Sequence, residues 1–313
     1  MTSLASNPTS YSLEDFHGSR SRMRKERIVR AVLFVAASTS IVISVAIVAS
    51  LIGEAWTFVS QVELAALWTD GWFPRRGMYD VKTLVSGSLI VTVIAMAVAG
   101  PLGLGAAVYL SEYAPAAVRK VVKPALEILA GIPSVVLGFF ALTFLSPVIV
   151  QRLNDEATQF NIAAAGIGVG ILTIPLVASI SEDAMRSVPM ALREASYGLG
   201  ARKITTTVRV VIPAAVSGLV AAFIVAVSRA IGETMVVFIA AGATGGSLFS
   251  TDVFKPGQTM TAAMASQAAG TDQVRGAGLT FQSLFFVGML LFLVTLVLNV
   301  LASRFVRRVR QAY

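Results

Sequence analysis

Long apolar runs alternate with short polar stretches along this sequence, and the pattern predicts an all-α membrane protein with six transmembrane helices. A helix needs about 20 predominantly apolar residues to cross the hydrocarbon core of a bilayer. Six runs are long enough, and we expect spans at about 31–52, 84–110, 128–150, 161–181, 214–241 and 282–303. The first run is too long and too far from Met1 for a cleaved signal peptide, so we interpret it as a retained span.

The distribution of lysine and arginine predicts how these spans are oriented. Eighteen of the 25 Lys and Arg residues lie before the first run, or after the second, fourth and sixth, whereas six lie in the alternate segments. Cytoplasmic loops carry the excess of basic residues, so we expect both termini in the cytoplasm. We expect residues 1–30 to be a disordered basic tail, 31–303 to be the transmembrane domain and 304–313 to be a second basic tail.

Composition narrows the possible functions. Only 13% of residues are charged, against about 25% in soluble domains. The net charge is +8, but its placement follows membrane topology, so we expect lipid and no nucleic acid as a partner. The chain has no cysteine and one histidine, His17, which disfavours a metal site and a nucleophilic triad. It also lacks a Gly-x-x-x-x-Gly-Lys-Ser/Thr loop, so we expect no ATP or other cofactor on this chain and no enzymatic activity.

Two outer loops and one glycine run complete the pattern. All three tryptophans, Trp56, Trp68 and Trp72, lie between the first two spans, where we expect an interfacial belt. In the loop 242–281, the stretch Met260–Ala269 is expected to form a short surface helix. Gly166-Ile-Gly-Val-Gly170, inside the fourth span, is interpreted as close helix packing.

The polar loop 187–213 between spans four and five is expected to form a helix–turn–helix bracket. Ser187 can cap a helix and Pro189 suits its first turn, while Gly200 suits the left-handed position that ends it. A second helical stretch is expected from Lys203 to Val211, with Pro213 opening span five.

This bracket resembles the EAA motif of ABC-importer permeases. The resemblance rests on Glu194-Ala195-Ser196, Gly200 four positions later, and Val210-x-Ile212-Pro213, with Ser196 in place of the second alanine. In that family the bracket docks into a groove on the ATP-hydrolysing subunit. The resemblance implies that five residues couple this chain to such a subunit: Glu194, Ala195, Ser196, Gly200 and Pro213.

Arg229 lies inside span five, where a charge costs about 2.5–3.5 kcal/mol on insertion scales. Glu233 is four positions on, so the two side chains share one helical face. Either the pair is purely structural, or Arg229 touches or gates an anion path while Glu233 orients it. The guanidinium fork suits phosphate or sulfate. Pro133 interrupts span three, and Ser134 is either a hydroxyl at that break or a packing residue.

The run Arg229-Ala-Ile-Gly-Glu-Thr-Met235 resembles the signature of phosphate-specific transport permeases, and Glu127 to Gly138 resembles their third-span signature. The residues in these two stretches resemble the PstC type of permease more than the PstA type. The resemblance implies a phosphate pathway marked by Arg229, Glu233, Ser134 and Thr234 in a bacterial inner-membrane permease. It also implies a PstA-like second permease, two PstB-like subunits that bind ATP, and an extracytoplasmic PstS-like phosphate-binding protein.

Three alternatives remain open at this point. A permease for sulfate, molybdate or another small solute would keep the bracket without needing Arg229 and Glu233. An ATP-independent secondary transporter or channel would have no use for the bracket. A membrane enzyme is disfavoured because the sequence has no cluster of metal ligands or nucleophiles.

Overall fold

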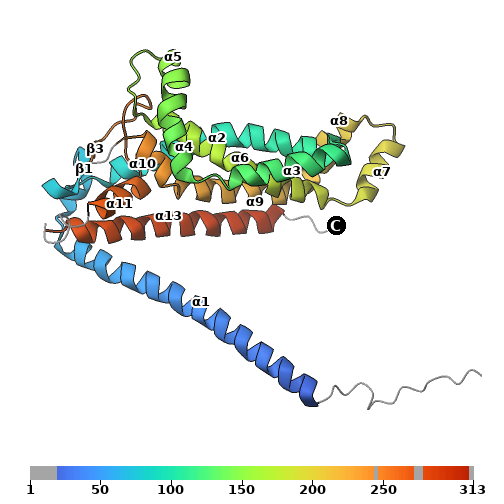
Figure 1. The fold of residues 1–313 in the computed structure, drawn as a ribbon, viewed down its shortest axis with the longest axis horizontal. Helices are drawn as coiled ribbons and strands as arrows, with labels where there is room; N and C mark the ends of the chain where they lie inside the picture. Colours follow the sequence, from blue (N-terminus) through green and yellow to red (C-terminus); the bar gives the residue numbers. More distant parts are fainter. Residues whose placement is uncertain (1–19, 243–245, 271–277, 310–313) are drawn as a thin grey trace, which may run out of the picture. The chain divides into compact units, whose positions relative to one another are not determined.

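The computed structural model of this chain describes residues 20–242, 246–270 and 278–309, in two units divided between Leu51 and Ile52 (Figure 1). Helix α1 (Arg20–Gln61) begins ten residues before the end of the expected tail. The Arg, Lys and Glu residues of that stretch are good helix formers, and a helix already formed extends readily through them. The remainder of the two expected tails, residues 1–19 and 310–313, lies outside the described residues.

Six helices among the described residues are long and apolar enough to cross a membrane, which confirms the expected number. They are Met23–Gln61, Val81–Tyr113, Ser134–Leu153, Ile162–Arg186, Lys203–Ile231 and Thr280–Arg304. The α-helices after α1 are α2 (Val81–Val108), α3 (Ala116–Ala130), α4 (Ser134–Phe140), α5 (Gln151–Leu153), α6 (Ile162–Arg186), α7 (Met190–Gly198), α8 (Lys203–Thr206), α9 (Ile212–Ile231), α10 (Met235–Ala240), α11 (Met260–Ala269) and α13 (Thr280–Val309). Wider π turns extend them at η4 (Tyr109–Tyr113), η5 (Ala141–Val150) and η6 (Thr207–Val211).

Helix α6 is the centre of the second unit. Sixteen of its 25 residues are buried, and it packs against α2, α3, α9 and α10. Asn161 caps its start, because the Asn161 side-chain oxygen accepts the Ala164 N–H at 2.7 Å. A Cβ added to Gly166 would lie 2.7 Å from the Ile94 Cβ, and one on Gly170 would lie 2.9 Å from the Ala95 carbonyl oxygen. The interpretation of this glycine run as close helix packing is therefore confirmed.

A small sheet and an aromatic cluster form the end of this unit opposite α7 and α8 (Figure 1). Strands β1 (Gly71–Phe73), β2 (Met78–Tyr79) and β3 (Ser247–Leu248) pair antiparallel in the order β2-β1-β3. The short turn η2 (Leu64–Trp68) precedes β1, and η3 (Pro74–Arg76) connects β1 to β2. Trp72 is buried with Phe58 and Tyr79, while Trp56 and Trp68 are exposed. The expectation of an interfacial belt was thus wrong for Trp72, because β1 turns that side chain into the cluster.

Helix α11 is not a surface helix, so that expectation was wrong. Its first turns are buried, and it packs against α2, α10 and α13. The Met260 N–H donates to the Ser88 hydroxyl at 3.0 Å, and the Thr259 hydroxyl caps the helix by accepting the Ala262 N–H. Small alanine side chains let α11 lie close to its neighbours, and these hydrogen bonds satisfy polar groups that burial would otherwise leave unpaired.

Two of the expected spans are broken. The third breaks between α3 and α4 at Gly131–Pro133, where Pro133 has no N–H and disfavours helical geometry at the preceding residue. The fifth breaks at Gly232–Thr234 between α9 and α10. Helix α4 packs against α10, so the helices that follow the two breaks cover each other. Non-helical backbone at membrane depth requires such protein cover or a wet cavity.

We expect Gly170→Val to destabilise the folded protein by about 1–3 kcal/mol, because the new side chain overpacks the α2–α6 contact. Thermal unfolding in detergent, followed by size-exclusion chromatography, measures the change. Gly105→Val in α2 is the matched control, since a Cβ there meets nothing within 4 Å. Equal melting temperatures for the two variants would contradict this account of the packing.

Candidate functional site

The bracket lies at one end of the second unit, formed by α7, α8 and η6 (Figure 1). Helix α6 runs on to Arg186, so Ser187 ends α6 and does not cap α7. The Ser187 hydroxyl donates to the Ala184 carbonyl at 2.8 Å. The expectation that Ser187 begins a helix was therefore wrong, because helical geometry continues through the polar residues after the apolar run. Pro189 directly precedes α7, which begins at Met190.

Gly200 reverses the chain at the tip of the bracket. Its φ angle is +78°, which confirms the left-handed position predicted for it. The Gly200 N–H donates to the Tyr197 carbonyl at 2.9 Å, and the Ala201 N–H donates to the Ser196 carbonyl at 3.2 Å. These two bonds form a Schellman motif, which satisfies the last carbonyls of α7 and fixes the angle between the two limbs.

The second limb of the bracket continues into span five without a break. One helix runs from Lys203 to Ile231 and passes through the π turn η6. Pro213 is the second residue of α9 (Ile212–Ile231), which confirms its expected place at the start of that helix, although the continuous helix already begins at Lys203. The wide turn before Pro213 accommodates a residue that has no N–H to donate. The hydroxyls of Ser196 and Thr206 lie 2.9 Å apart and join the two limbs.

The remaining motif residues of α7 face outward. Glu194 and Ala195 are exposed, and Leu199 at the tip is 90% exposed, with Met190 and Tyr197 also exposed. An exposed apolar tip beside a carboxylate is a surface suited to docking in a groove of another protein. The structure therefore presents Glu194, Ala195 and Gly200 together at this end of the unit.

Arg193 is a residue whose role the sequence did not reveal, since it counted there only as a cytoplasmic cation. Its side chain is buried, and its Nη2 lies 2.9 Å from Oε1 of Glu112 in η4. Arg193 also donates to the Val188 carbonyl at 2.6 Å and to the Met185 carbonyl at 2.8 Å. This one guanidinium thus contacts the end of α6 and the extension of α2.

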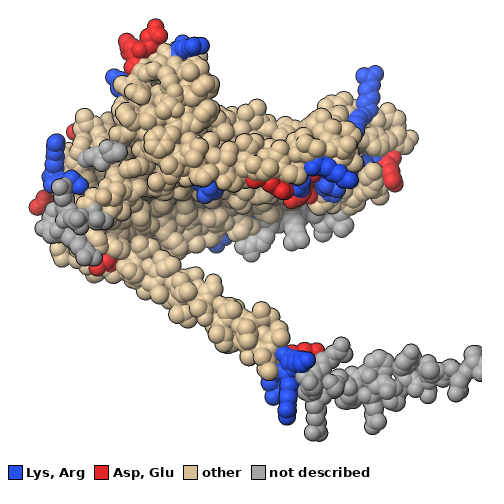
Figure 2. All heavy atoms as spheres, viewed as in Figure 1, with Lys and Arg blue, Asp and Glu red and all other residues tan. Residues whose placement is uncertain are grey.

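A second group of charges lies close by, where Figure 2 shows Lys and Arg beside Asp and Glu near the α7–α8 end. Glu182 is fully buried, and its carboxylate lies 3.2 Å from Lys123, 3.5 Å from Arg186 and 3.8 Å from Arg119. Burial tends to lower the pKa of the Lys123 ammonium, but hydrogen bonds to Asp183 and Glu182 outweigh it and raise this pKa above its ordinary value. These contacts hold α3 against α6.

The structure brings Arg229 and Glu233 together at the break after α9. Arg229 Nη2 lies 3.8 Å from Glu233 Oε2, with the Arg229 side chain 54% exposed and that of Glu233 5% exposed. The Glu233 carboxylate also accepts the Val236 N–H at 3.4 Å, and its backbone carbonyl accepts the Thr261 hydroxyl at 2.8 Å. Glu233 is therefore fixed in place. The Arg229 guanidinium lies against the Glu233 carboxylate, and about half of the Arg229 side chain stays exposed.

Thr234 lies directly after this pair and Ser134 lies on a neighbouring element. The Thr234 hydroxyl donates to the Gly232 carbonyl at 3.4 Å. Ser134 begins α4, which packs against α10, but Ser134 makes no hydrogen bond with Arg229 or Glu233 in the described part of the chain. The two breaks are thus linked through α4 and α10 rather than through direct contact of these side chains.

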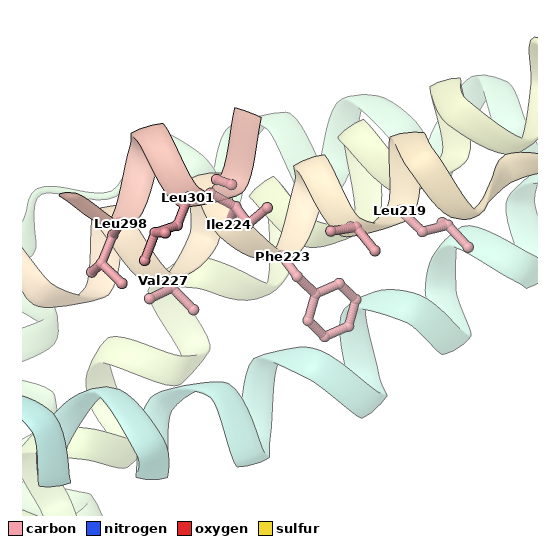
Figure 3. Close-up of a pocket in the computed structure, with 8 residues that line it drawn as sticks. Leu219, Phe223, Ile224, Val227, Leu298 and Leu301 are labelled. Carbon is pink, nitrogen blue, oxygen red and sulfur yellow. The ribbon is translucent and has the colours of Figure 1, made fainter. Parts of the chain in front are cut away.

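A groove of about 680 Å³ between α9 and α13 does not resemble an anion path. It is lined by apolar side chains, among them Phe223, Ile224 and Leu298 (Figure 3). An ion such as phosphate would lose its hydration there without gaining a hydrogen-bond donor. The polar residues Ser134, Arg229, Glu233 and Thr234 lie at or beside the two breaks, outside this groove.

Residues 99–311 match the family described as "Binding-protein-dependent transport system inner membrane component". A "Probable ABC transporter permease protein YqgH" of Bacillus subtilis is 40% identical over 166 residues, which is 53% of this chain and 53% of that protein. The phosphate transport system permease protein PstC of Mesorhizobium japonicum is 30% identical and covers 83% of each chain. PstC 1 of Mycobacterium tuberculosis is 33% identical and covers 75% of each.

Two solved structures share this fold at low sequence identity. A chain of a bacterial alginate ABC transporter, in complex with an alginate pentasaccharide-bound periplasmic protein, has a TM-score of 0.66 and 13% identity over 93% of this chain and 98% of that one. A chain of the MetNI methionine ABC transporter has a TM-score of 0.53 and 18% identity over 74% of this chain and 94% of that one. Both likenesses concern the fold alone.

We expect Gly200→Val to loosen the bracket, because a left-handed conformation costs an L-residue about 1–2 kcal/mol. Trypsin should then cleave faster at Arg202 and Lys203 in the detergent-solubilised protein. Gly198→Ala, at the same tip but with helical backbone and open space around its Cβ, is expected to keep the original rate. An unchanged rate in Gly200→Val would show that the Schellman motif does not hold the tip.

Proposed function

The chain belongs to the family of binding-protein-dependent transport system inner membrane components, and from this premise we propose that it is the permease subunit of an ATP-driven importer of inorganic phosphate. As a transport component of the bacterial inner membrane, it is not an enzyme. In this proposal it forms half of the translocation pathway. ATP is hydrolysed on a partner chain, and the protein holds no cofactor of its own.

The observation that carries the phosphate proposal is the exposed Arg229 beside the buried Glu233. An arginine inside a membrane protein must face a wet cavity or a partner, because lipid cannot solvate it. The Glu233 carboxylate lies on one side of the guanidinium at 3.8 Å and leaves its other donors accessible. A planar fork with free donors matches two oxygens of a tetrahedral oxyanion. Relatives named as PstC phosphate permeases support phosphate as that oxyanion.

The polar groups at the two breaks extend the proposed pathway. Ser134 and Thr234 offer hydroxyls beside interrupted backbone, where peptide groups freed from helical bonding can also reach a solute. Glu233 positions Arg229 and is not itself a phosphate ligand, since a carboxylate repels an anion. A second candidate function is import of another oxyanion, because the guanidinium fork alone does not distinguish phosphate from sulfate.

The bracket supports the proposed dependence on ATP. Glu194, Ala195, Ser196, Gly200 and Pro213 would couple the chain to an ATP-hydrolysing subunit, with the exposed surface of α7 entering its groove. The proposed complete importer contains a PstA-like second permease, two PstB-like ATP-binding subunits and a PstS-like phosphate-binding protein outside the membrane.

We expect Arg229→Gln to lower phosphate uptake about tenfold or more, because a charge-assisted hydrogen bond to the anion is lost. The measurement is uptake of labelled phosphate in membrane vesicles that contain the assembled importer, with labelled sulfate run in parallel. Arg152→Gln, which removes an exposed arginine of α5, is expected to leave uptake unchanged. Unchanged uptake in Arg229→Gln would make the residue structural, and faster sulfate than phosphate uptake would favour the second candidate.

Purification of the chain in mild detergent tests its dependence on ATP. An ATP-hydrolysing subunit is expected to co-purify, and uptake by the reconstituted complex is expected to require ATP. Transport by the isolated chain without ATP would reject the importer class.

A further inference from the structure

Both limbs of the bracket contact the same short segment, η4 (Tyr109–Tyr113), which extends α2. Arg193 of α7 pairs with Glu112 at 2.9 Å. Lys203 of α8 places its ammonium 5.0 Å from the centre of the Tyr113 ring. These two contacts come from opposite sides of the Gly200 turn, so η4 is held by the bracket as a whole.

The Arg193–Glu112 contact is buried and specific in its geometry. The Arg193 side chain is 9% exposed and that of Glu112 is 4% exposed. Arg193 Nε lies 3.4 Å from the second Glu112 oxygen, so the guanidinium faces both oxygens of the carboxylate. The Ser111 hydroxyl donates to Glu112 at 2.9 Å and steadies it from its own element. A fork-to-carboxylate pair of this kind fixes both distance and orientation.

The other Arg193 contacts fix it to the end of α6, through the Met185 and Val188 carbonyls. The same region of α2 is also held by Arg119, which donates to the Leu110 carbonyl at 2.9 Å and faces Glu182 of α6. If α7 moved without η4, two buried charges would lose their partners, which is far more costly than moving both together. The bracket and the inner end of α2 are therefore expected to move as one body.

We propose that the Arg193–Glu112 pair is a link through which the bracket drives α2 as well as the two spans to which the chain connects it directly. This inference rests on the proposed function, because it assumes that an ATP-hydrolysing subunit moves the bracket. Arg193 and Glu112 act here as positioning residues, distant from the solute. The link delivers motion to α2, which packs along α6 and α9 and so reaches the helix that carries Arg229.

The test uses the assembled importer, with ATP hydrolysis and phosphate uptake measured on the same vesicles. In Arg193→Gln and Glu112→Gln we expect an assembled complex that still hydrolyses ATP, with phosphate imported per ATP lowered at least tenfold. Arg193→Lys keeps the charge but not the fork, so it should recover part of this ratio. Lys120→Gln is the control: it removes an exposed basic residue of α3 at the same end of the unit, and should keep the wild-type ratio.

A crosslink provides a second measurement, because the chain has no cysteine of its own. The double variant Glu112→Cys/Arg193→Cys should hydrolyse ATP but import little phosphate. A short thiol-specific crosslinker that joins the two cysteines should restore the phosphate imported per ATP. A wild-type ratio in Arg193→Gln, or a crosslinked protein that stays uncoupled, would overturn the link. Failure of all these variants to assemble would assign the pair to folding alone and also overturn it. Absence of phosphate uptake in the wild-type complex would count instead against the proposed function.

Discussion

A bilayer core offers no water to a peptide N–H or carbonyl, and the architecture of this chain follows from that constraint. Continuous helices satisfy their own backbone, so the six spans need only apolar surfaces. The exceptions are the breaks at Gly131–Pro133 and Gly232–Thr234, and each needs protein around it. Helices α4 and α10 supply that cover for each other. Helix α11 packs beside the second break, where the Thr261 hydroxyl donates to the Glu233 carbonyl. Arg229, Glu233 and Ser134, which we propose to line the pathway, thus lie beside backbone that is interrupted and covered by neighbouring helices.

The two ends of the second unit are stabilised by different forces. At the sheet end, Phe58 meets Tyr79 edge-on at 5.0 Å and stacks on Phe286 at 4.8 Å, so aromatic packing joins the small sheet to α13. At the bracket end, buried carboxylates at Glu112 and Glu182 hold four basic side chains, Arg193, Arg119, Lys123 and Arg186. Apolar packing tolerates small shifts, whereas a buried ion pair tolerates few, because its strength depends on geometry. The charged end is therefore the one suited to carrying a directed movement.

Sequence patterns predicted the features that depend on neighbours along the chain. The six spans follow from local hydropathy, the left-handed Gly200 from its place after a helix, and the close packing of the fourth span from its glycine run, although the sequence did not show that α2 is the partner. The missed features depend on distant partners. Trp72 is buried only because β1 pairs with β2 and β3, and Arg193 meets Glu112 across 81 positions. The break at Gly232 lies inside the single expected span 214–241, where long apolar stretches on both sides kept the mean hydropathy high and hid the interruption.

The glycine contact between α2 and α6 has a mechanical consequence. Where Gly166 and Gly170 meet Ile94 and Ala95, nearly bare backbone of one helix rests on the other. Glycine has no rotamers, so this face of α6 loses no side-chain entropy on packing and has no alternative rotamer to adopt under load. A helix–helix contact with so little side-chain freedom on one face is expected to be stiff. We therefore expect a displacement of one helix at this contact to pass to the other with less side-chain repacking than a contact between long side chains would allow.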